Sequence, residues 1–215
     1  MKALLQLKPF LFSILFFGLA AGSAAQGIKD QRKTDERVQK FLEENRQRWQ
    51  DLNVPYEDGK VLYDLIVKNN YRSALEIGTS TGHSTVWIAW ALSKTGGKLI
   101  TIELDEKRQK QAVENLKAVG LADFVDFRLG DAHQIVKELE GPFDFVFSDA
   151  DKDWYVQYFK DIDPKLKKGG RFTAHNVLQN MSGIPEYMEF VKGHPDYETT
   201  LDRTSSSGIA ISHKK

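Results

Sequence analysis

Cysteine is absent from this 215-residue sequence, and neither sign of charge is in excess. Without a thiol, the chain can form no disulfide, thiolate nucleophile or cysteine-bound metal centre. Lys and Arg together number 30, as do Asp and Glu, so there is no electrostatic reason to expect nucleic acid as a partner. Hydrophobic residues make up 41% and charged residues 28%, which argues against a disordered chain and against a membrane protein with several spans. We therefore expect one globular domain.

A long apolar run lies near the beginning of the sequence. Residues 1–25 combine a positively charged start, an apolar stretch of signal-peptide length and small residues just before Gln26. We predict a cleaved export signal, so that residues 26–215 form a periplasmic or secreted domain. The alternative is an uncleaved membrane anchor, for which the apolar run is at the short end. N-terminal sequencing distinguishes the two, since Gln26 as the first residue indicates cleavage.

The polar segment that follows is typical of an amphipathic helix. Residues 29–50 are rich in charged side chains, with a thin apolar stripe that includes Val38, Leu42 and Trp49. We predict that this helix packs on the domain or on a second subunit, as in a homodimer.

From residue 73 onward, short apolar runs alternate with amphipathic segments. The predicted strands cover residues 73–79, 98–104, 125–131, 143–150, 169–176, 197–204 and 208–214. The predicted helices cover residues 57–69, 83–94, 106–119, 133–139, 154–166 and 185–192. This alternation implies a doubly wound α/β fold with a mostly parallel sheet and right-handed crossovers. The last two strands are joined by a short serine-rich turn and should be antiparallel.

The first strand ends in a glycine-containing turn. In an open α/β sheet, ligands bind beyond the carboxyl ends of the strands, so this turn is a candidate binding element. It contains Gly78 and Gly82, but Ser80 and His83 stand where a dinucleotide fingerprint requires glycine. The pyrophosphate cradle for NAD is therefore absent, which argues against a dehydrogenase.

Acidic residues end the next two predicted strands. Glu103 stands 25 residues after Gly78, where an acid commonly holds a ribose diol. Asp131 ends the third strand, near the place of an adenine. Ser84 and the free N–H groups at the start of its helix can bind a carboxylate. A ligand with a nucleoside but no pyrophosphate indicates S-adenosylmethionine (SAM).

The fourth and fifth strand tips carry side chains suited to chemistry. Asp149 and Lys152 follow the fourth strand, and His175 and Asn176 follow the fifth. Brought together, Asp149, His175 and Asn176 can hold a divalent cation with open positions for substrate. Lys152 can reach the same spot and act as a base. The alternatives are a solvated helix start and a structural histidine.

Taken together, these motifs resemble those of the cation-dependent O-methyltransferases, the family of catechol and caffeoyl-CoA O-methyltransferases. The resemblance covers roughly residue 54 to the C-terminus. It rests on Glu-x-Gly-x-x-x-Gly-x-Ser at 76–84, Glu103, Gly-Asp-Ala at 130–132, Asp149 with Lys152, and Ser-Gly-Ile-Ala-Ile-Ser at 207–212. It implies a seven-stranded, Rossmann-like methyltransferase sheet with one antiparallel strand.

The resemblance also implies roles for individual residues. Contact with SAM is expected of Glu76, Gly78, Thr79, Ser80, Ser84, Glu103, Asp131, Ala132, His133 and Asp149. Asp149 and Asn176 would be metal ligands, and Lys152 the base. The family has an Asp-Asn pair where this chain has His175-Asn176. An imidazole there favours manganese, iron or zinc over magnesium, or abolishes metal binding and leaves His175 as a second base.

The implied activity is SAM-dependent methylation of a hydroxyl on a small phenolic or catechol-like acceptor. A divalent cation that bridges two adjacent oxygens, helped by Lys152, would generate the phenolate. The alternative is a non-catalytic binding protein that has lost the metal site of the family.

Overall fold

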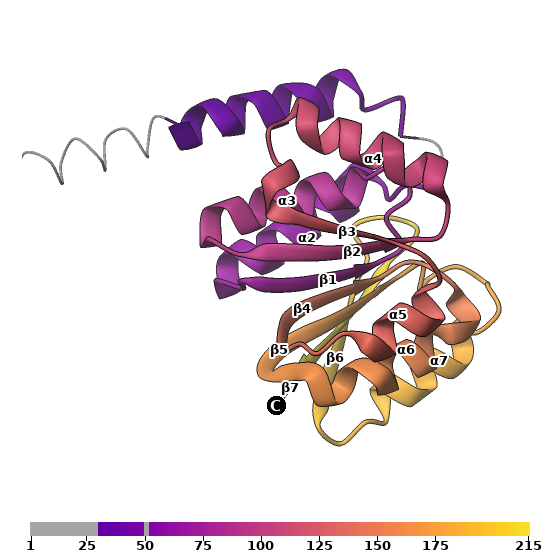
Figure 1. Cartoon of the computed structure of the whole chain (residues 1–215). Coiled ribbons are helices and arrows are strands. Elements are labelled where there is room, and N and C mark those ends of the chain that lie inside the picture. The colour runs from indigo at the N-terminus through magenta and orange to yellow at the C-terminus, as the bar shows by residue number, and fades with distance from the viewer. Residues whose placement is uncertain (1–29, 50–51) are drawn as a thin grey trace, which may run out of the picture.

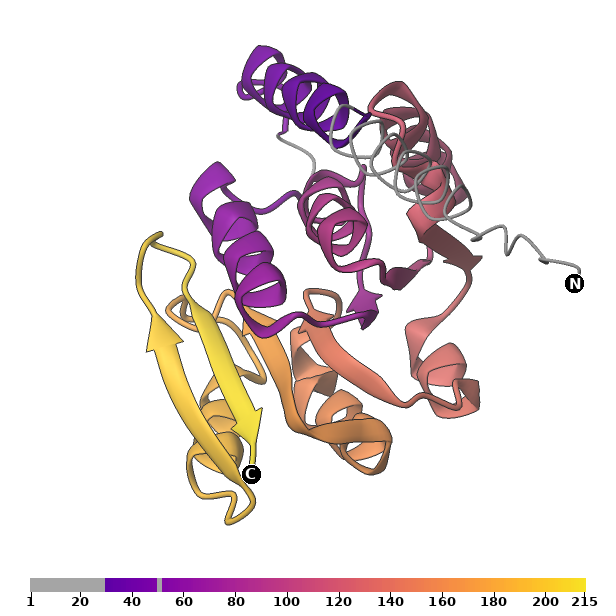
Figure 2. The same cartoon turned by 90° about the vertical axis from the view of Figure 1, so that its left-hand side faces the viewer.

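Seven short apolar segments form one sheet in the computed structural model, which describes residues 30–49 and 52–215. The strands are β1 (Ser73–Ile77), β2 (Lys98–Glu103), β3 (Val125–Leu129), β4 (Phe143–Ser148), β5 (Leu166–His175), β6 (Tyr197–Asp202) and β7 (Ile209–Lys214). Their spatial order is β3-β2-β1-β4-β5-β7-β6, and β7 runs antiparallel to both of its neighbours. The predicted doubly wound sheet with one antiparallel strand is confirmed. Figure 2 shows the β6–β7 hairpin at one edge of the sheet.

Helices cover both faces of the sheet (Figure 1). One layer contains α2 (Tyr56–Asn69), α3 (His83–Thr95) and α4 (Glu106–Ala118), and the other contains α5 (Ala132–Glu138), α6 (Tyr155–Ile162) and α7 (Ile184–Lys192). Three short 3-10 helices are η1 (Ala122–Phe124), η2 (Lys152–Trp154) and η3 (Asp163–Lys165). The predicted helices agree with these bounds except at 154–166, where the chain forms η2, α6 and η3 in succession and enters β5 at Leu166.

Aspartate caps start two helices directly after their strands. The Asp105 carboxylate accepts hydrogen bonds from the N–H groups of Lys107 and Arg108 at 2.8 and 3.0 Å. The Asp131 carboxylate accepts from the N–H of His133 at 2.9 Å. Such caps satisfy N–H groups that lack a partner within the helix, so α4 and α5 can begin within a few residues of β2 and β3. The tips of both strands are thereby held at the same edge of the sheet.

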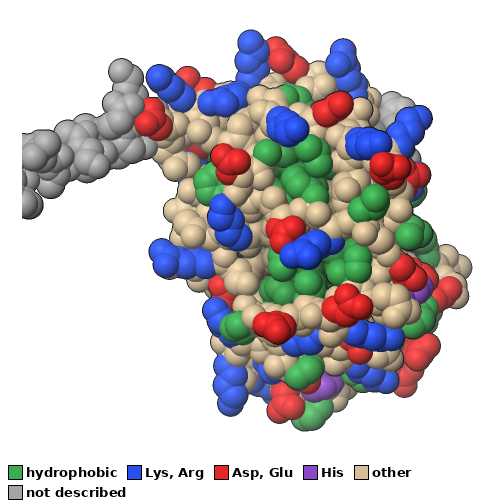
Figure 3. Space-filling view, in the orientation of Figure 1, with side chains coloured by type: hydrophobic (Ala, Val, Ile, Leu, Met, Phe, Trp, Pro, Cys, Tyr) green, Lys and Arg blue, Asp and Glu red, His purple; other side chains and the backbone are tan. Residues whose placement is uncertain are grey.

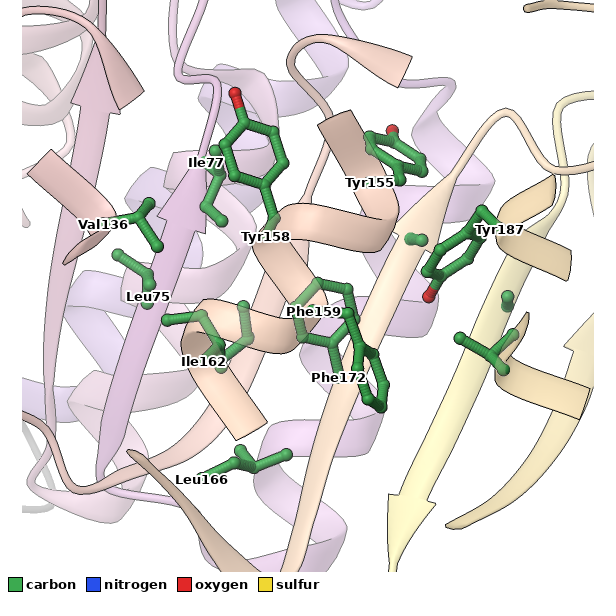
Figure 4. Close-up of a cluster of buried hydrophobic side chains, with 14 of the residues drawn as sticks. Leu75, Ile77, Val136, Tyr155, Tyr158, Phe159, Ile162, Leu166, Phe172 and Tyr187 are labelled. Carbon is green, nitrogen blue, oxygen red and sulfur yellow. The ribbon is translucent and has the colours of Figure 1, made fainter. Parts of the chain in front are cut away.

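An aromatic-rich core lies between the sheet and the layer of α5, α6 and α7 (Figure 4). Tyr155, Tyr158, Phe159 and Ile162 of α6 are at most 1% exposed. The ring centroids of Phe159 and Phe172, on β5, lie 5.1 Å apart. Burial of such side chains contributes about 1.5–3 kcal/mol each, which fixes α6 and the chain before it on the sheet.

A helix over residues 30–44 adds a second layer outside α3 and α4 (Figure 1). Val38 and Leu42 are fully buried in a cluster with side chains of α3 and α4. Asp35 accepts a hydrogen bond from the indole N–H of Trp90 at 2.8 Å. Within the chain, this helix therefore packs on the domain; the homodimer stays a prediction.

The predicted export signal at residues 1–25 lies outside the described residues. In the described part of the chain, none of the helices combines the length and apolar character needed to cross a membrane. On the face seen in Figure 3, side chains of both charge signs are interspersed around apolar side chains near the centre.

Candidate active site

A cavity of about 720 Å³ opens at the carboxyl ends of the parallel strands. Residues that follow β1, β2, β3, β4 and β5 all contribute to its wall, which is where an open α/β sheet binds ligands. The predicted site residues that line it are Gly78, Ser80, Glu103, Asp131, Ala132, His133, Asp149, Lys152, His175 and Asn176. The fold thus brings residues from distant parts of the chain into one cavity.

The turn after β1 holds the tips of three strands close together. Gly78 has a φ of +100°, and a Cβ there would lie 3.0 Å from the backbone N of Ala150 and the backbone C of Asp149. Both the positive φ and this close approach require glycine. Ser80 has a φ of +49°, and its N–H donates to Oε2 of Glu103 at 2.7 Å. Backbone can therefore approach a ligand closely at this turn.

The carboxylate of Glu103 is oriented by backbone N–H groups on both of its oxygens. Oε2 accepts from Ser80, and Oε1 accepts from the N–H of Asp105 at 2.9 Å. A carboxylate oxygen has more than one acceptor site, so each can take a further hydroxyl. Because Glu103 lines the cavity, its carboxylate can accept both hydroxyls of a ribose.

Glu76, Thr79 and Ser84 are buried, and none of them is among the residues that line the cavity. The hydroxyls of Thr85 and Thr101 donate to Oε2 of Glu76, each at 2.6 Å. The Thr79 hydroxyl lies 2.5 Å from that of Thr101. Burial raises the pKa of Glu76 to about 7. Glu76, Thr79 and Ser84 therefore support the β1 turn on its buried side, away from the cavity.

A stacked histidine lies at the start of α5. The rings of His133 and Trp154 stack with centroids 3.8 Å apart and an interplanar angle of 16°. Nε2 of His133 is 3.3 Å from Oδ2 of Asp151. With Asp131 and Ala132 beside it, His133 forms a partly polar wall next to Glu103 that suits a planar ring such as adenine.

Asp149 and Lys152 form a partly enclosed ion pair at the end of β4. The ammonium of Lys152 donates to Oδ1 of Asp149 at 2.8 Å and to its backbone carbonyl at 3.0 Å. Lys152 occupies the first position of η2, which the Asp151 carboxylate caps through the N–H of Asp153 at 3.1 Å. The short helix therefore turns the lysine back towards the strand tip and into the cavity wall.

His175 links two carboxylates. Its Nδ1 lies 3.1 Å from Oδ1 of Asp149, and its Nε2 lies 2.7 Å from Oδ2 of Asp58. Burial alone would lower the pKa of His175, but the two carboxylates outweigh it and raise the pKa to about 9. Burial alone would raise the pKa of Asp149, but His175 and Lys152 outweigh it and lower the pKa. The two carboxylates therefore favour the imidazolium form of His175.

The residues of the predicted metal site do not fit a metal ion in this arrangement. Both ring nitrogens of His175 point at carboxylates, so neither offers a lone pair to a metal. Asn176, with a φ of +60°, lines the cavity beside it. Among residues 30–49 and 52–215, no group of three His, Asp or Glu side chains is arranged to hold a metal ion. The same contacts leave neither nitrogen of His175 free to act as the predicted second base.

Sequence reasoning did not identify Asp58. This residue is fully buried, and its Oδ2 also accepts a hydrogen bond from the Ser205 hydroxyl at 2.7 Å. A signal was present in the sequence, because Asp58 stands four and eight residues before the core residues Leu62 and Ile66. An acid on the apolar stripe of an amphipathic helix calls for a buried partner.

Apolar residues at the mouth of the cavity were also not predicted. Leu52, Leu104 and Met181 line the cavity and are 71%, 73% and 39% exposed. They lie in three segments well separated in the sequence, so no local pattern links them. Large apolar side chains gathered at a cavity mouth are typical of a ligand-binding surface.

The chain is similar to known O-methyltransferases. The model of the O-methyltransferase family matches residues 29–187. The catechol O-methyltransferase of Niastella koreensis is 38% identical over 139 residues, which cover 63% of this chain and 62% of that protein. Caffeoyl-CoA O-methyltransferase 1 of Eucalyptus globulus is 33% identical over 172 residues, which cover 76% of this chain and 70% of that protein. The match thus spans less than two thirds of the length of the catechol enzyme.

The chain is also similar to O-methyltransferases of known structure. The O-methyltransferase from Bacillus cereus, in complex with S-adenosylhomocysteine (SAH), has 29% identity and a TM-score of 0.71 over 86% of this chain and 91% of that one. The O-methyltransferase TomG from Streptomyces achromogenes, involved in tomaymycin synthesis and in complex with SAM, has 28% identity and a TM-score of 0.73 over 84% and 90%.

Proposed function

This chain belongs to the O-methyltransferase family, and we propose that it transfers the methyl group of SAM to a hydroxyl of a small phenolic or catechol-like acceptor. Membership confirms the family-level resemblance drawn from the sequence motifs. The observation that carries the proposal is one strand-end cavity that contains both an oriented carboxylate, Glu103, and an ion pair, Lys152 with Asp149. The first suits the cofactor, and the second suits the activation of a hydroxyl.

In this proposal the cofactor lies along the strand tips. The two ribose hydroxyls donate to Glu103, and the methionine end lies near the backbone of Gly78 and Ser80. The adenine lies beside His133. Two of the similar solved structures are named as complexes with SAM or SAH, which supports this choice of cofactor.

The reaction is a displacement at the methyl carbon. A new bond forms between the acceptor oxygen and the methyl carbon, while the bond from this carbon to sulfur breaks and its electron pair stays on sulfur. The ammonium of Lys152 first releases a proton to solvent, and the uncharged amine that results takes the proton of the acceptor hydroxyl. Alignment of the oxygen with the methyl group supplies much of the remaining acceleration.

The acceptor is proposed to bind at the mouth of the cavity. The apolar side chains of Leu52, Leu104 and Met181 can cover an aromatic ring, while its hydroxyl points inward to Lys152 and Asp149. The names of the two curated relatives, a catechol and a caffeoyl-CoA O-methyltransferase, support an acceptor with a phenolic ring.

Calorimetric titration with SAM and SAH tests the cofactor site. We expect one molecule to bind, and we expect Glu103→Gln to weaken the affinity about 10- to 100-fold, since hydrogen bonds to a charged group contribute about 1.5–3 kcal/mol. Glu106→Gln is the matched control, because Glu106 is an exposed acid at the start of α4. SAH release over a panel of phenols then tests transfer. Absence of binding at millimolar SAM would rule the proposal out.

A further inference from the structure

Four charged side chains form a continuous chain from α2 to the cavity. Oδ2 of Asp58 contacts Nε2 of His175 at 2.7 Å, and Nδ1 of His175 contacts Oδ1 of Asp149 at 3.1 Å. The same Oδ1 accepts from Lys152 at 2.8 Å. Two carboxylates thus alternate with two cationic groups.

The geometry specifies which atoms carry protons. An ionised carboxylate only accepts hydrogen bonds, so a ring nitrogen that contacts one must be the donor. Both nitrogens of His175 contact carboxylates, so the geometry favours a ring with a hydrogen on each nitrogen, which is an imidazolium. A metal ion needs a nitrogen lone pair, which this ring does not have. The four charges already balance, so a further divalent cation would gain little attraction.

Asp58 depends on this arrangement. It is fully buried, its Oδ2 accepts from His175 and Ser205, and its Oδ1 has no hydrogen-bond partner among the described residues. A buried carboxylate without a cation is strongly unfavourable, so Asp58 and His175 stabilise each other as a pair. Ser205, in the turn between β6 and β7, also holds Asp58 in place through its hydroxyl.

We propose that the His175 imidazolium, anchored by Asp58, occupies the place of a divalent cation in this site, so that methyl transfer requires no metal. The inference rests on the proposed function. Asp58 and His175 are positioning residues: they fix Oδ1 of Asp149 together with Lys152.

The buried positive charge also has an electrostatic consequence. As the acceptor hydroxyl loses its proton to Lys152, negative charge develops on the acceptor oxygen. The new ammonium of Lys152 and the imidazolium of His175 both lie on the side of Asp149 and attract this charge. A preorganised positive group in a poorly solvated site is effective in this role.

Metal binding is measured first, on the wild-type protein with SAH. Electron paramagnetic resonance of added Mn²⁺ should show no site occupied below about 1 mM, and methyl transfer should be unchanged by EDTA. His175→Asp replaces the imidazolium by a carboxylate, the ligand that hard divalent cations prefer. This variant should bind Mn²⁺ at least 10-fold more tightly than the wild type.

A second measurement does not depend on activity or on the stability of a variant. Nitrogen-15 NMR of the His175 ring in the wild type should show both nitrogens protonated at neutral pH. Asp58→Asn should remove the signature of a doubly protonated ring and lower kcat at least 10-fold with little change in KM. Asp64→Asn, an exposed acid on the same helix, is the matched control and should change neither.

The outcomes separate this inference from the proposed function. One Mn²⁺ ion bound to the wild type and lost in Asp149→Asn, loss of activity in EDTA, or a singly protonated His175 ring would each overturn the metal-free site. Failure of SAM and SAH to bind would instead overturn the proposed function, while the Mn²⁺ and NMR results would still decide the state of His175.

Discussion

Lys152 is tied to Asp149 by two hydrogen bonds, one to the carboxylate and one to the backbone carbonyl of the same residue. Its ammonium group is therefore held beside the end of β4 before any substrate arrives. A general base held in this way contributes about 10²–10⁴-fold to a reaction rate. At the scale of the residue, the site is preorganised around the atom that takes the proton.

Removal of this amine should affect transfer much more than cofactor binding. We expect Lys152→Met to lower kcat at least 100-fold, because the methionine retains the apolar stem but accepts no proton. The affinity for SAH should stay within about threefold of the wild type, because the ribose and adenine contacts proposed above do not involve Lys152. SAH release and calorimetry measure the two quantities.

Lys160→Met provides the comparison, since Lys160 is an exposed lysine of the neighbouring helix α6. It should have wild-type kcat. Equal kcat for Lys152→Met and the wild type would remove Lys152 from the reaction and leave the hydroxyl proton to another acceptor.

The site could be predicted from the sequence only where its residues stand at the end of a strand or a few residues after it. Glu103 and Lys152 were found because strand tips converge in a parallel sheet. Asp58 lies on a helix almost 120 residues before His175, and only the packing of α2 brings the two side chains together. The place of Asp58 on the apolar stripe of its helix indicates a buried partner, but a single sequence does not show that this partner is His175.

At the scale of elements, the alternation of strands and helices was predictable because periodicities of 2 and 3.6 residues differ clearly in this chain. The exception is the predicted helix at 154–166, which the structure divides between η2, α6 and η3. Pro164 has no backbone N–H, so the α-helix cannot continue through it. Leu166 then pairs with Phe143 of β4 at the start of β5.

Buried apolar side chains hold the helix over residues 30–44 to the domain. Leu42 is fully buried in the cluster that this helix forms with α3 and α4. We expect Leu42→Ala to lower the free energy of unfolding by about 2–5 kcal/mol, the usual range when a buried leucine is truncated. Urea denaturation followed by circular dichroism measures the change.

Gln39→Ala, an exposed position on the same helix, should change the free energy of unfolding by less than about 0.5 kcal/mol. A similar small effect for Leu42→Ala would mean that the helix detaches at little cost. The packing seen here would then contribute little to the stability of the domain.

At the scale of the whole molecule, two buried histidines give the stability opposite dependences on pH. The ring of His83 contacts the carbonyl of Val54 at 2.8 Å and accepts from the indole N–H of Trp87 at 3.1 Å. This pattern holds the neutral ring, and burial lowers the pKa of His83 to about 4. His175 is held as the cation, and its pKa is raised. The contribution of His83 to the free energy of unfolding is therefore lost as the pH falls below neutral, and the contribution of His175 is lost as the pH rises above neutral.

The direction in which His83 makes stability depend on pH follows from proton uptake by the unfolded chain. Between the unfolded pKa of 6.5 and the folded pKa of about 4, the unfolded chain binds a proton at this ring and the folded chain does not. The free energy of unfolding should thus fall by about 3 kcal/mol because of His83 as the pH drops from 6.5 to 4.

The variant His83→Asn tests this dependence. It keeps a donor for Val54 but cannot titrate, so its free energy of unfolding should vary less between pH 6.5 and 4 than that of the wild type. His213→Asn, at a partly exposed histidine of β7, should leave the wild-type slope intact. Urea denaturation of the three proteins at several pH values measures these slopes, and parallel curves for His83→Asn and the wild type would show that His83 takes up its proton in the folded state as readily as in the unfolded one.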